Sequence, residues 1–234
     1  MKVAVMQPYF MPYIGYFQMI KAVDKFVFYD DVNFIKQGWI NRNRILLQHT
    51  DFLFTVPLQK ATSFSLIKDT FINQKFYASW KEKFLQSIAQ NYKKAPHFEV
   101  TYSLISAVLN KNFQSISELA IESVKMVSGY LNLNTEFYVA SERYQNKELE
   151  REKRLISICK NENATDYINA VGGKELYSKE IFKENGVELQ FIASKPIVYK
   201  QFKDDFIPWL SIIDVLMFNS VAEVNELLNE YELT

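Results

Sequence analysis

The start of the chain alternates between apolar runs and an amphipathic segment, a pattern that predicts a strand, a helix and a second strand. The two apolar runs cover residues 3–6 and 26–29, and each of them stops abruptly at polar residues. Between them, apolar residues at three-residue spacing predict a helix over residues 13–23. Ligands of such βαβ units bind beyond the carboxyl ends of the strands. A functional site is therefore expected where the two runs end.

Polar residues are concentrated at those two positions. Gln7 directly follows the first run. A dense polar group follows the second run and consists of Asp30, Asp31, Asn33, Lys36, Asn41, Arg42, Asn43 and Arg44. We interpret this group, together with Gln7, as the best candidate site in the chain.

The rest of the chain first departs from this alternation and then returns to it. Residues 51–57 are typical of a strand that ends at a proline, and residues 70–72 of a short strand. Apolar residues at helical spacing then predict a block of three helices, at residues 76–92, 100–110 and 115–131. Strands follow at residues 136–140, 166–170 and 187–192, and helices at residues 147–161, 175–184, 208–218 and 222–231.

Short strands that alternate with helices favour a mainly parallel sheet. We therefore predict an α/β fold with a mainly parallel sheet flanked by helices. The sequence shows no linker, repeat or low-complexity tract, so we expect residues 1–234 to form a single α/β domain. The helical block at residues 76–131 is then an insertion into this domain or a cap on it.

The composition limits the function. The 234 residues include 27 Lys and Arg against 27 Asp and Glu, so no bulk charge steers the chain toward nucleic acid or acidic lipid. No apolar run approaches the roughly 18 residues of a membrane span, and the amino terminus lacks the pattern of a signal peptide. Cys159 is the only cysteine, which excludes an intrachain disulfide and a cysteine-based zinc cluster. We expect a reduced, cytoplasmic, soluble protein.

The turn after the first run has features of an anion site. Pro12 sits where the helix begins, and the free N–H groups at a helix start suit an anion. Gly15 in the first turn lets a ligand approach closely, or it only lets the helix pack tightly. Tyr13 and Tyr16 are candidate binding residues, because aromatic rings offer apolar faces to a base or a sugar.

Asp30 and Asp31 directly follow an apolar strand. Carboxylates at a strand end bind a metal, act as a base, or hold a sugar hydroxyl. The alternative is a helix cap or a salt bridge. We take both residues as candidate catalytic groups, because the arginines that follow them favour a site at the same place.

Asparagines and arginines alternate in residues 41–44. In an extended segment Arg42 and Arg44 share one face, and their guanidinium forks match phosphate and carboxylate groups. The alternative is a charged edge strand in contact with solvent. The candidate substrate-binding residues of this region are Lys36, Trp39, Asn41, Arg42, Asn43 and Arg44.

A second turn has the same arrangement as the first, with a strand before it and a helix after it. Gly172 and Gly173 follow the expected strand at residues 166–170 and open a helix, so we interpret them as the opposite wall of the same crevice. The sequence has neither the glycine triplet of a dinucleotide site nor a P-loop. Asp214 lies within an apolar helical segment, where it either pairs with a buried arginine or lines the cleft.

Four motifs together resemble those of the WbqC-like protein family. They are QPYFMPYIGYF at residues 7–17, VFYDDVNF at residues 27–34, WINRNRI at residues 39–45 and SIIDVL at residues 211–216. The resemblance extends over nearly the whole chain. It implies a role in surface-polysaccharide (O-antigen-type) biosynthesis, in which glycine or another acyl group is attached to the amine of a nucleotide-linked amino sugar. It carries over no catalytic residue, so the candidate residues above rest on the residue patterns alone.

Three functions stay open at this point. The first is a transferase in which Arg42 and Arg44 hold the phosphates of a nucleotide sugar and Asp30 or Asp31 acts as the base. Its expected co-reactants are Mg²⁺ or an activated acyl or aminoacyl donor, and no residue is assigned as a metal ligand. The second is an ATP-dependent adenylate-forming enzyme, by analogy of layout alone. The third is a non-catalytic binding module of the same pathway. No nucleic-acid partner is expected.

Overall fold

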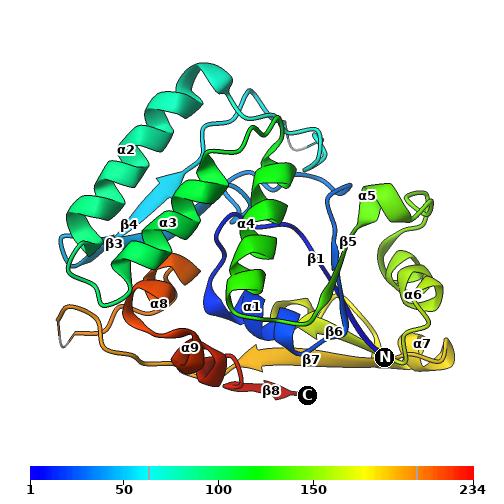
Figure 1. The fold of residues 1–234 in the computed structure, drawn as a ribbon. Coiled ribbons are helices and arrows are strands. Elements are labelled where there is room, and N and C mark those ends of the chain that lie inside the picture. Colours follow the sequence, from blue (N-terminus) through cyan, green and yellow to red (C-terminus); the bar gives the residue numbers. More distant parts are fainter. Residues whose placement is uncertain (63, 204) are drawn as a thin grey trace.

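A six-stranded sheet forms the centre of the computed structural model, which describes residues 1–62, 64–203 and 205–234 (Figure 1). The strand order is β5-β2-β1-β6-β7-β8. The strands are β1 (Lys2–Met6), β2 (Lys25–Phe28), β5 (Glu136–Val139), β6 (Asp166–Ala170), β7 (Glu188–Ser194) and β8 (Tyr231–Leu233). Neighbours from β5 to β7 pair in parallel, and β8 pairs antiparallel with β7. The predicted α/β fold with a mainly parallel sheet is confirmed.

Helices flank this sheet. They are α1 (Ile14–Lys21), α2 (Gln74–Tyr92), α3 (Phe98–Leu109), α4 (Ile116–Tyr130), α5 (Ala140–Arg143), α6 (Arg151–Asn161), α7 (Lys179–Glu184), α8 (Ile212–Phe218) and α9 (Val221–Leu227). A short 3₁₀ turn, η1 (Val171–Gly173), follows β6. The start of α4 is fixed by a capping box, in which the Ser115 hydroxyl accepts from the Glu118 N–H and the Glu118 carboxylate accepts from the Ser115 N–H.

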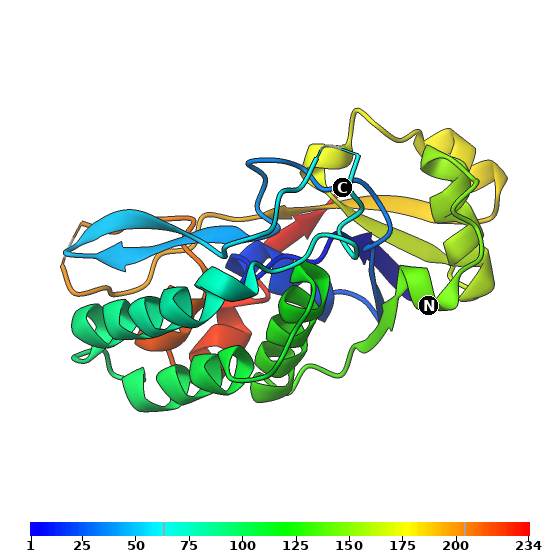
Figure 2. The same ribbon diagram turned by 90° about the horizontal axis from the view of Figure 1, so that it is seen from above.

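Strand residues that point to opposite faces supply two apolar clusters. In β2, Phe26 and Phe28 belong to the cluster that includes α1, α8 and the helical block α2–α4. Val27 belongs to the other cluster, which includes α6 and α7. This period-two alternation is expected of a strand that is covered on both faces. Figure 2 shows α2–α4 and α6–α7 at opposite ends of the molecule. The helical block thus shares one apolar cluster with the sheet.

A separate antiparallel hairpin joins β3 (Arg42–Leu47) to β4 (Thr50–Thr55). Its two turn residues, Gln48 and His49, have φ angles of 51° and 64°. Left-handed φ angles at both central positions are those of a type I′ turn, whose twist matches that of the two strands it connects. The strand predicted at residues 51–57 is therefore present as β4, and residues 42–47 form its partner.

Several predicted elements differ in the structure. The helices expected from residues 147, 175 and 208 begin only at Arg151, Lys179 and Ile212. The helix expected at residues 222–231 ends at Leu227, and the chain then turns and adds β8 to the sheet. The spacing of apolar residues does not predict this strand, because its three residues are held by pairing with β7, which is distant in the sequence. The short strand expected at residues 70–72 makes only isolated bridges, from Phe71 to Ser115 and from Ile72 to Leu58.

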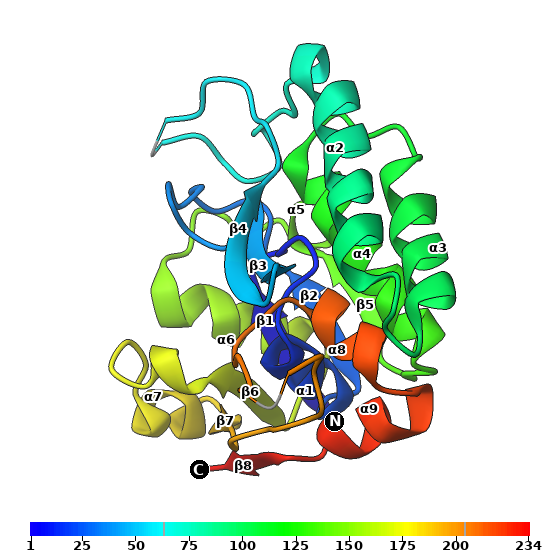
Figure 3. The ribbon, with the colours of Figure 1, turned by 90° about the vertical axis from the view of Figure 1, so that its left-hand side faces the viewer.

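The strand order creates a topological switch point between β1 and β6. From β1 the chain winds outward through β2 to β5, and from β6 it winds the opposite way to β7. Parallel sheets of this kind bind ligands where the carboxyl ends of the strands diverge. Figure 3 looks onto this edge, with the β3–β4 hairpin above it and the orange segment between β7 and α8 crossing in front.

Candidate ligand-binding site

A cavity of about 290 Å³ lies at this edge, beside the switch point. We call it the switch-point cavity. Tyr13 and Gly15 line it from the start of α1, Gly172 from η1, Ser194 from the end of β7, and Trp209 from the segment between β7 and α8. Segments that are distant in sequence thus meet in one hollow. The helix start after β1 and the glycine turn after β6 thus both contribute to the lining of this cavity.

Gly15 is required for the close approach of two of these walls. A Cβ atom at this position would lie 2.4 Å from Cε2 of Tyr13 and 2.6 Å from Oγ of Ser194. A Cβ at Gly172 would meet nothing within 4 Å, and at Gly173 it would lie 2.8 Å from Nδ2 of Asn169. Of the two interpretations of Gly15, these distances favour tight packing of the helix against the sheet. This packing also shapes the cavity.

Replacing Gly15 with alanine is expected to lower the free energy of unfolding by about 1–3 kcal/mol, because the new methyl group must push Tyr13 or Ser194 aside. Gly172→Ala is the matched control, since it adds the same methyl group in open space on the same cavity. Urea unfolding of the two variants measures the difference. Equal stabilities would contradict the packing role of Gly15.

The sequence patterns did not reveal Ser194 or Trp209 as residues of this site. Trp209 has a φ angle of 60° and its side chain is 61% exposed. A left-handed aromatic residue carries backbone strain, which tends to persist at ligand clamps. Its ring meets the Tyr13 ring edge-on, with centroids 6.2 Å apart. The helix predicted from residue 208 begins only at Ile212, so Trp209 lies in irregular chain where periodicity gives no signal.

The start of α1 has no side-chain cap. Pro12 precedes it and uses its carbonyl to accept a hydrogen bond from the N–H of Ile212. Tyr16 is fully buried and its hydroxyl donates to the Gln7 carbonyl at 2.8 Å. Burial raises the pKa of Tyr16 well above its usual value. Gln7 and Tyr16 thus hold the turn after β1, while Tyr13 faces the cavity.

Asp30 and Asp31 both have partners inside the protein. Asp30 accepts hydrogen bonds from the Ser141 N–H at 3.0 Å and from the Ser141 hydroxyl at 2.6 Å. Burial raises the pKa of Asp30, although these two bonds act in the opposite direction. Asp31 pairs with Arg154 at 2.5 Å, and both side chains are buried. Neither aspartate lines the switch-point cavity, and their catalytic role stays a prediction.

The arginines of β3 share a face, as predicted for an extended segment. The guanidinium groups of Arg42 and Arg44 lie 5.7 and 5.3 Å from the centre of the Trp39 ring. Asn41 and Asn43 are buried and donate to the carbonyls of Val56 and Met11. The asparagines therefore brace the hairpin. The arginines are half-buried, Arg42 donates to the Gly38 carbonyl and Arg44 pairs with Asp51. Lys36 is exposed in the loop before them. None of these side chains lines the switch-point cavity.

Asp214 is fully buried in α8 and fits neither expectation, because among the described residues it pairs with no arginine and it does not line the switch-point cavity. Its carboxyl oxygens accept from Nε2 of Gln201 at 3.3 and 3.2 Å, and Tyr199 provides a further hydrogen bond. Burial raises its pKa to about 8, against the effect of these bonds. Gln201 also binds the backbone N–H and carbonyl of Ile207. Asp214 therefore anchors the segment that carries Trp209.

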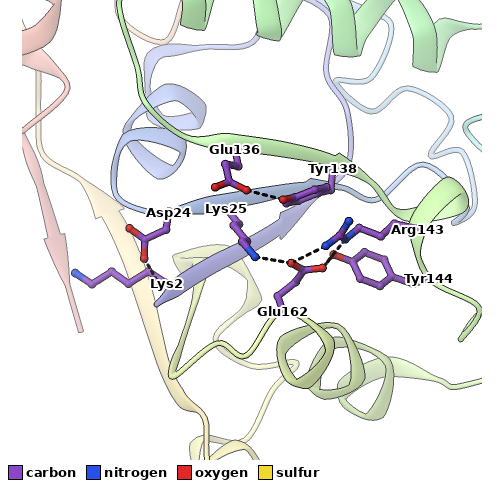
Figure 4. A network of polar contacts seen from close by, with 8 residues as sticks. All are labelled: Lys2, Asp24, Lys25, Glu136, Tyr138, Arg143, Tyr144 and Glu162. Carbon is purple, nitrogen blue, oxygen red and sulfur yellow. Dashed lines mark hydrogen bonds and ion pairs between the residues drawn. The ribbon is translucent and has the colours of Figure 1, made fainter.

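A further buried carboxylate, that of Glu162, is the centre of a polar network. Glu162 accepts hydrogen bonds from Lys25 at 2.8 Å, from Arg143 at 2.6 and 3.2 Å, and from Tyr144 at 2.8 Å (Figure 4). Burial alone would raise its pKa, but these donors outweigh burial and lower it to about 2. This network joins the start of β2 to the ends of α5 and α6.

Within residues 1–62, 64–203 and 205–234, no three His, Cys, Asp or Glu side chains are grouped so that they could hold a metal ion. In the same part of the chain, no helix is both long and apolar enough to cross a membrane.

Comparisons with known proteins place these features in a wider group. The WbqC-like protein family matches residues 7–226, nearly the whole chain. The "Uncharacterized protein Rv1507c" of Mycobacterium tuberculosis is 30% identical over 230 residues, which cover 97% of each chain. No solved structure matches the chain. The matched range includes Tyr13, Gly15, Gly172 and Trp209.

Proposed function

The chain belongs to the WbqC-like protein family, and we propose that it is a transferase of surface-polysaccharide synthesis. In this proposal it attaches an acyl or aminoacyl group to the amine of a nucleotide-linked amino sugar. The observation that supports this function best is the switch-point cavity. It lies where parallel α/β sheets bind small ligands, and its walls come from the two turns that the sequence singled out.

The chemistry of the walls suits a nucleotide-linked sugar. Tyr13 and Trp209 offer aromatic faces on which a sugar or a base stacks. The start of α1 has no side-chain cap and contributes Tyr13 and Gly15 to the lining, and the positive dipole end of a helix favours a phosphate. Gly172 leaves room beside them, because no side chain fills its position. Ser194 adds a hydroxyl for hydrogen bonding.

The transfer itself joins two substrates. The neutral sugar amine attacks the carbonyl carbon of an activated acyl derivative, such as a thioester. The new C–N bond forms while the bond between the carbonyl carbon and its leaving group breaks, and the leaving group takes the bonding electron pair. The amine proton passes to a base, for which Asp30 and Asp31 remain our sequence-based candidates. Positioning of the two substrates is the larger demand on the protein.

Trp209→Ala is expected to weaken the binding of a UDP-linked amino sugar roughly tenfold or more, since a stacked ring is worth about 1–3 kcal/mol. Phe76→Ala is the matched control, because Phe76 is an equally exposed aromatic residue on α2, away from the cavity. Isothermal titration calorimetry of wild type and both variants checks this. Equal affinities for wild type and Trp209→Ala would remove the switch-point cavity from the proposal.

A further inference from the structure

A second, larger cavity of about 450 Å³ adjoins the switch-point cavity. Tyr13, Ser194 and Trp209 line both of them, so the edge-on pair of Tyr13 and Trp209 rings stands at their boundary. We call the second one the apolar cavity. Its further walls are dominated by Ile14, Ile197, Val198, Phe206, Leu210 and Val215.

The walls of the apolar cavity offer almost no charge to an occupant. Among the described residues that line it, Lys195 is the one that carries a charge, and its exposed side chain lies 3.9 Å from the carboxylate of Glu232. Tyr199 also lines the cavity, but it provides a hydrogen bond to Asp214 behind the wall. Aliphatic side chains and prolines make up most of the remaining surface. We therefore expect an apolar occupant.

The size of the apolar cavity separates the candidate donors of the proposed reaction. Its volume of about 450 Å³ lies within the 300–1,000 Å³ that is typical of small-molecule sites. A glycyl group has no side chain and would leave this space empty. A planar base would stack on the rings at the boundary but would leave the aliphatic far wall uncovered. A flexible hydrocarbon chain fits the whole lining.

We propose that the apolar cavity binds the hydrocarbon chain of an acyl donor, whose carbonyl group then lies at the Tyr13–Trp209 boundary beside the switch-point cavity. This inference rests on the proposed transferase function and specifies its donor as an aliphatic acyl compound instead of glycine. The carbonyl carbon is then within reach of an amine that is bound on the other side of the boundary.

A chain-length series tests the inference on the wild-type protein. Acetate, butyrate, hexanoate and octanoate are titrated separately by calorimetry. Each methylene group that enters the apolar cavity is expected to raise the affinity about fourfold, which corresponds to ~0.8 kcal/mol per buried CH₂. An affinity that does not rise with chain length overturns the inference.

Two filling variants locate the chain. Val198 and Ile197 line the apolar cavity, and Val198 is 71% exposed, so Val198→Trp and Ile197→Trp are expected to fold and to block the space. At least one of them should lower octanoate affinity tenfold. Val100→Trp, at an exposed position of α3, is the matched control and should leave it unchanged. Unchanged octanoate affinity in both filling variants overturns the inference.

The remaining outcomes separate this inference from the proposed function. If uridine competes with octanoate, and the filling variants also weaken the binding of uridine, the apolar cavity is a base site and the inference is overturned. Wild-type protein that binds octanoate with the expected chain-length dependence, but no UDP-linked amino sugar, supports the inference and contradicts the proposed function. Binding of both probes together supports both.

Discussion

Replacing Arg154 with methionine is expected to lower the free energy of unfolding by about 3–5 kcal/mol, because it leaves the buried carboxylate of Asp31 without its counter-ion. The other oxygen of Asp31, Oδ1, is buried and has no hydrogen-bond partner in the described part of the chain. The guanidinium group also lies 4.6 Å from the centre of the Tyr29 ring, so this contact is lost as well. Urea unfolding followed by circular dichroism measures the change.

Arg44→Met is the matched control for this variant. Arg44 also pairs with an aspartate, Asp51, at 3.2 Å, but their side chains are 40% and 48% exposed. A surface pair of this kind contributes about 1 kcal/mol or less. The double variant Asp31→Leu/Arg154→Met should recover part of the lost stability, since it removes both charges. Similar losses for Arg154→Met and Arg44→Met would show that Arg154 is not the essential partner of Asp31.

Replacing Asp214 with asparagine is expected to raise the stability of the protein near pH 8 and to have little effect near pH 4. Burial raises the pKa of Asp214 to about 8 in the folded chain, whereas its usual value is 3.8. Between these two values the folded chain holds a proton that the unfolded chain releases. The stability of the wild type therefore falls as the pH rises through this window, by up to about 1.4 kcal/mol per pH unit. Asparagine does not titrate and removes this loss.

Melting temperatures of wild type and Asp214→Asn, recorded from pH 4 to pH 8, check this prediction. Asp24→Asn is the control, because Asp24 is exposed. Titration of the remaining groups is common to all three proteins and cancels in the difference. Glu162 titrates outside the window, since its pKa is lowered to about 2 and its contribution is lost only in acid. Parallel curves for wild type and Asp214→Asn would show that Asp214 is ionised in the folded protein.

The sequence was informative wherever apolar residues are periodic. The runs at residues 3–6 and 26–29 became β1 and β2, so the carboxyl edge of the sheet could be predicted, together with the two turns that line the switch-point cavity. The partners of Asp30 and Asp31 could not be predicted. Ser141 and Arg154 lie 111 and 123 residues away in the chain, and no local pattern links them to the aspartates.

The segment between β7 and α8 also escaped prediction, for a different reason. Its order comes from single side chains, such as Gln201, which binds the backbone of Ile207 and the carboxyl group of Asp214. Such contacts produce no hydrophobic period. In the sequence nothing distinguishes Trp209 from other aromatic residues. Only the folded chain shows that it lines two cavities.

The antiparallel strand β8 has a consequence for self-association. It is three residues long and pairs with Ile192–Ser194, the last three residues of β7, which at seven residues is the longest strand of the sheet. At the opposite edge, β5 has four residues. Open strand edges are templates onto which further chains add, and short edge strands blunt this tendency. Removal of β8 would expose backbone groups of β7, the strand that leads into both cavities. This edge of the sheet would then be able to pair with a strand of another chain.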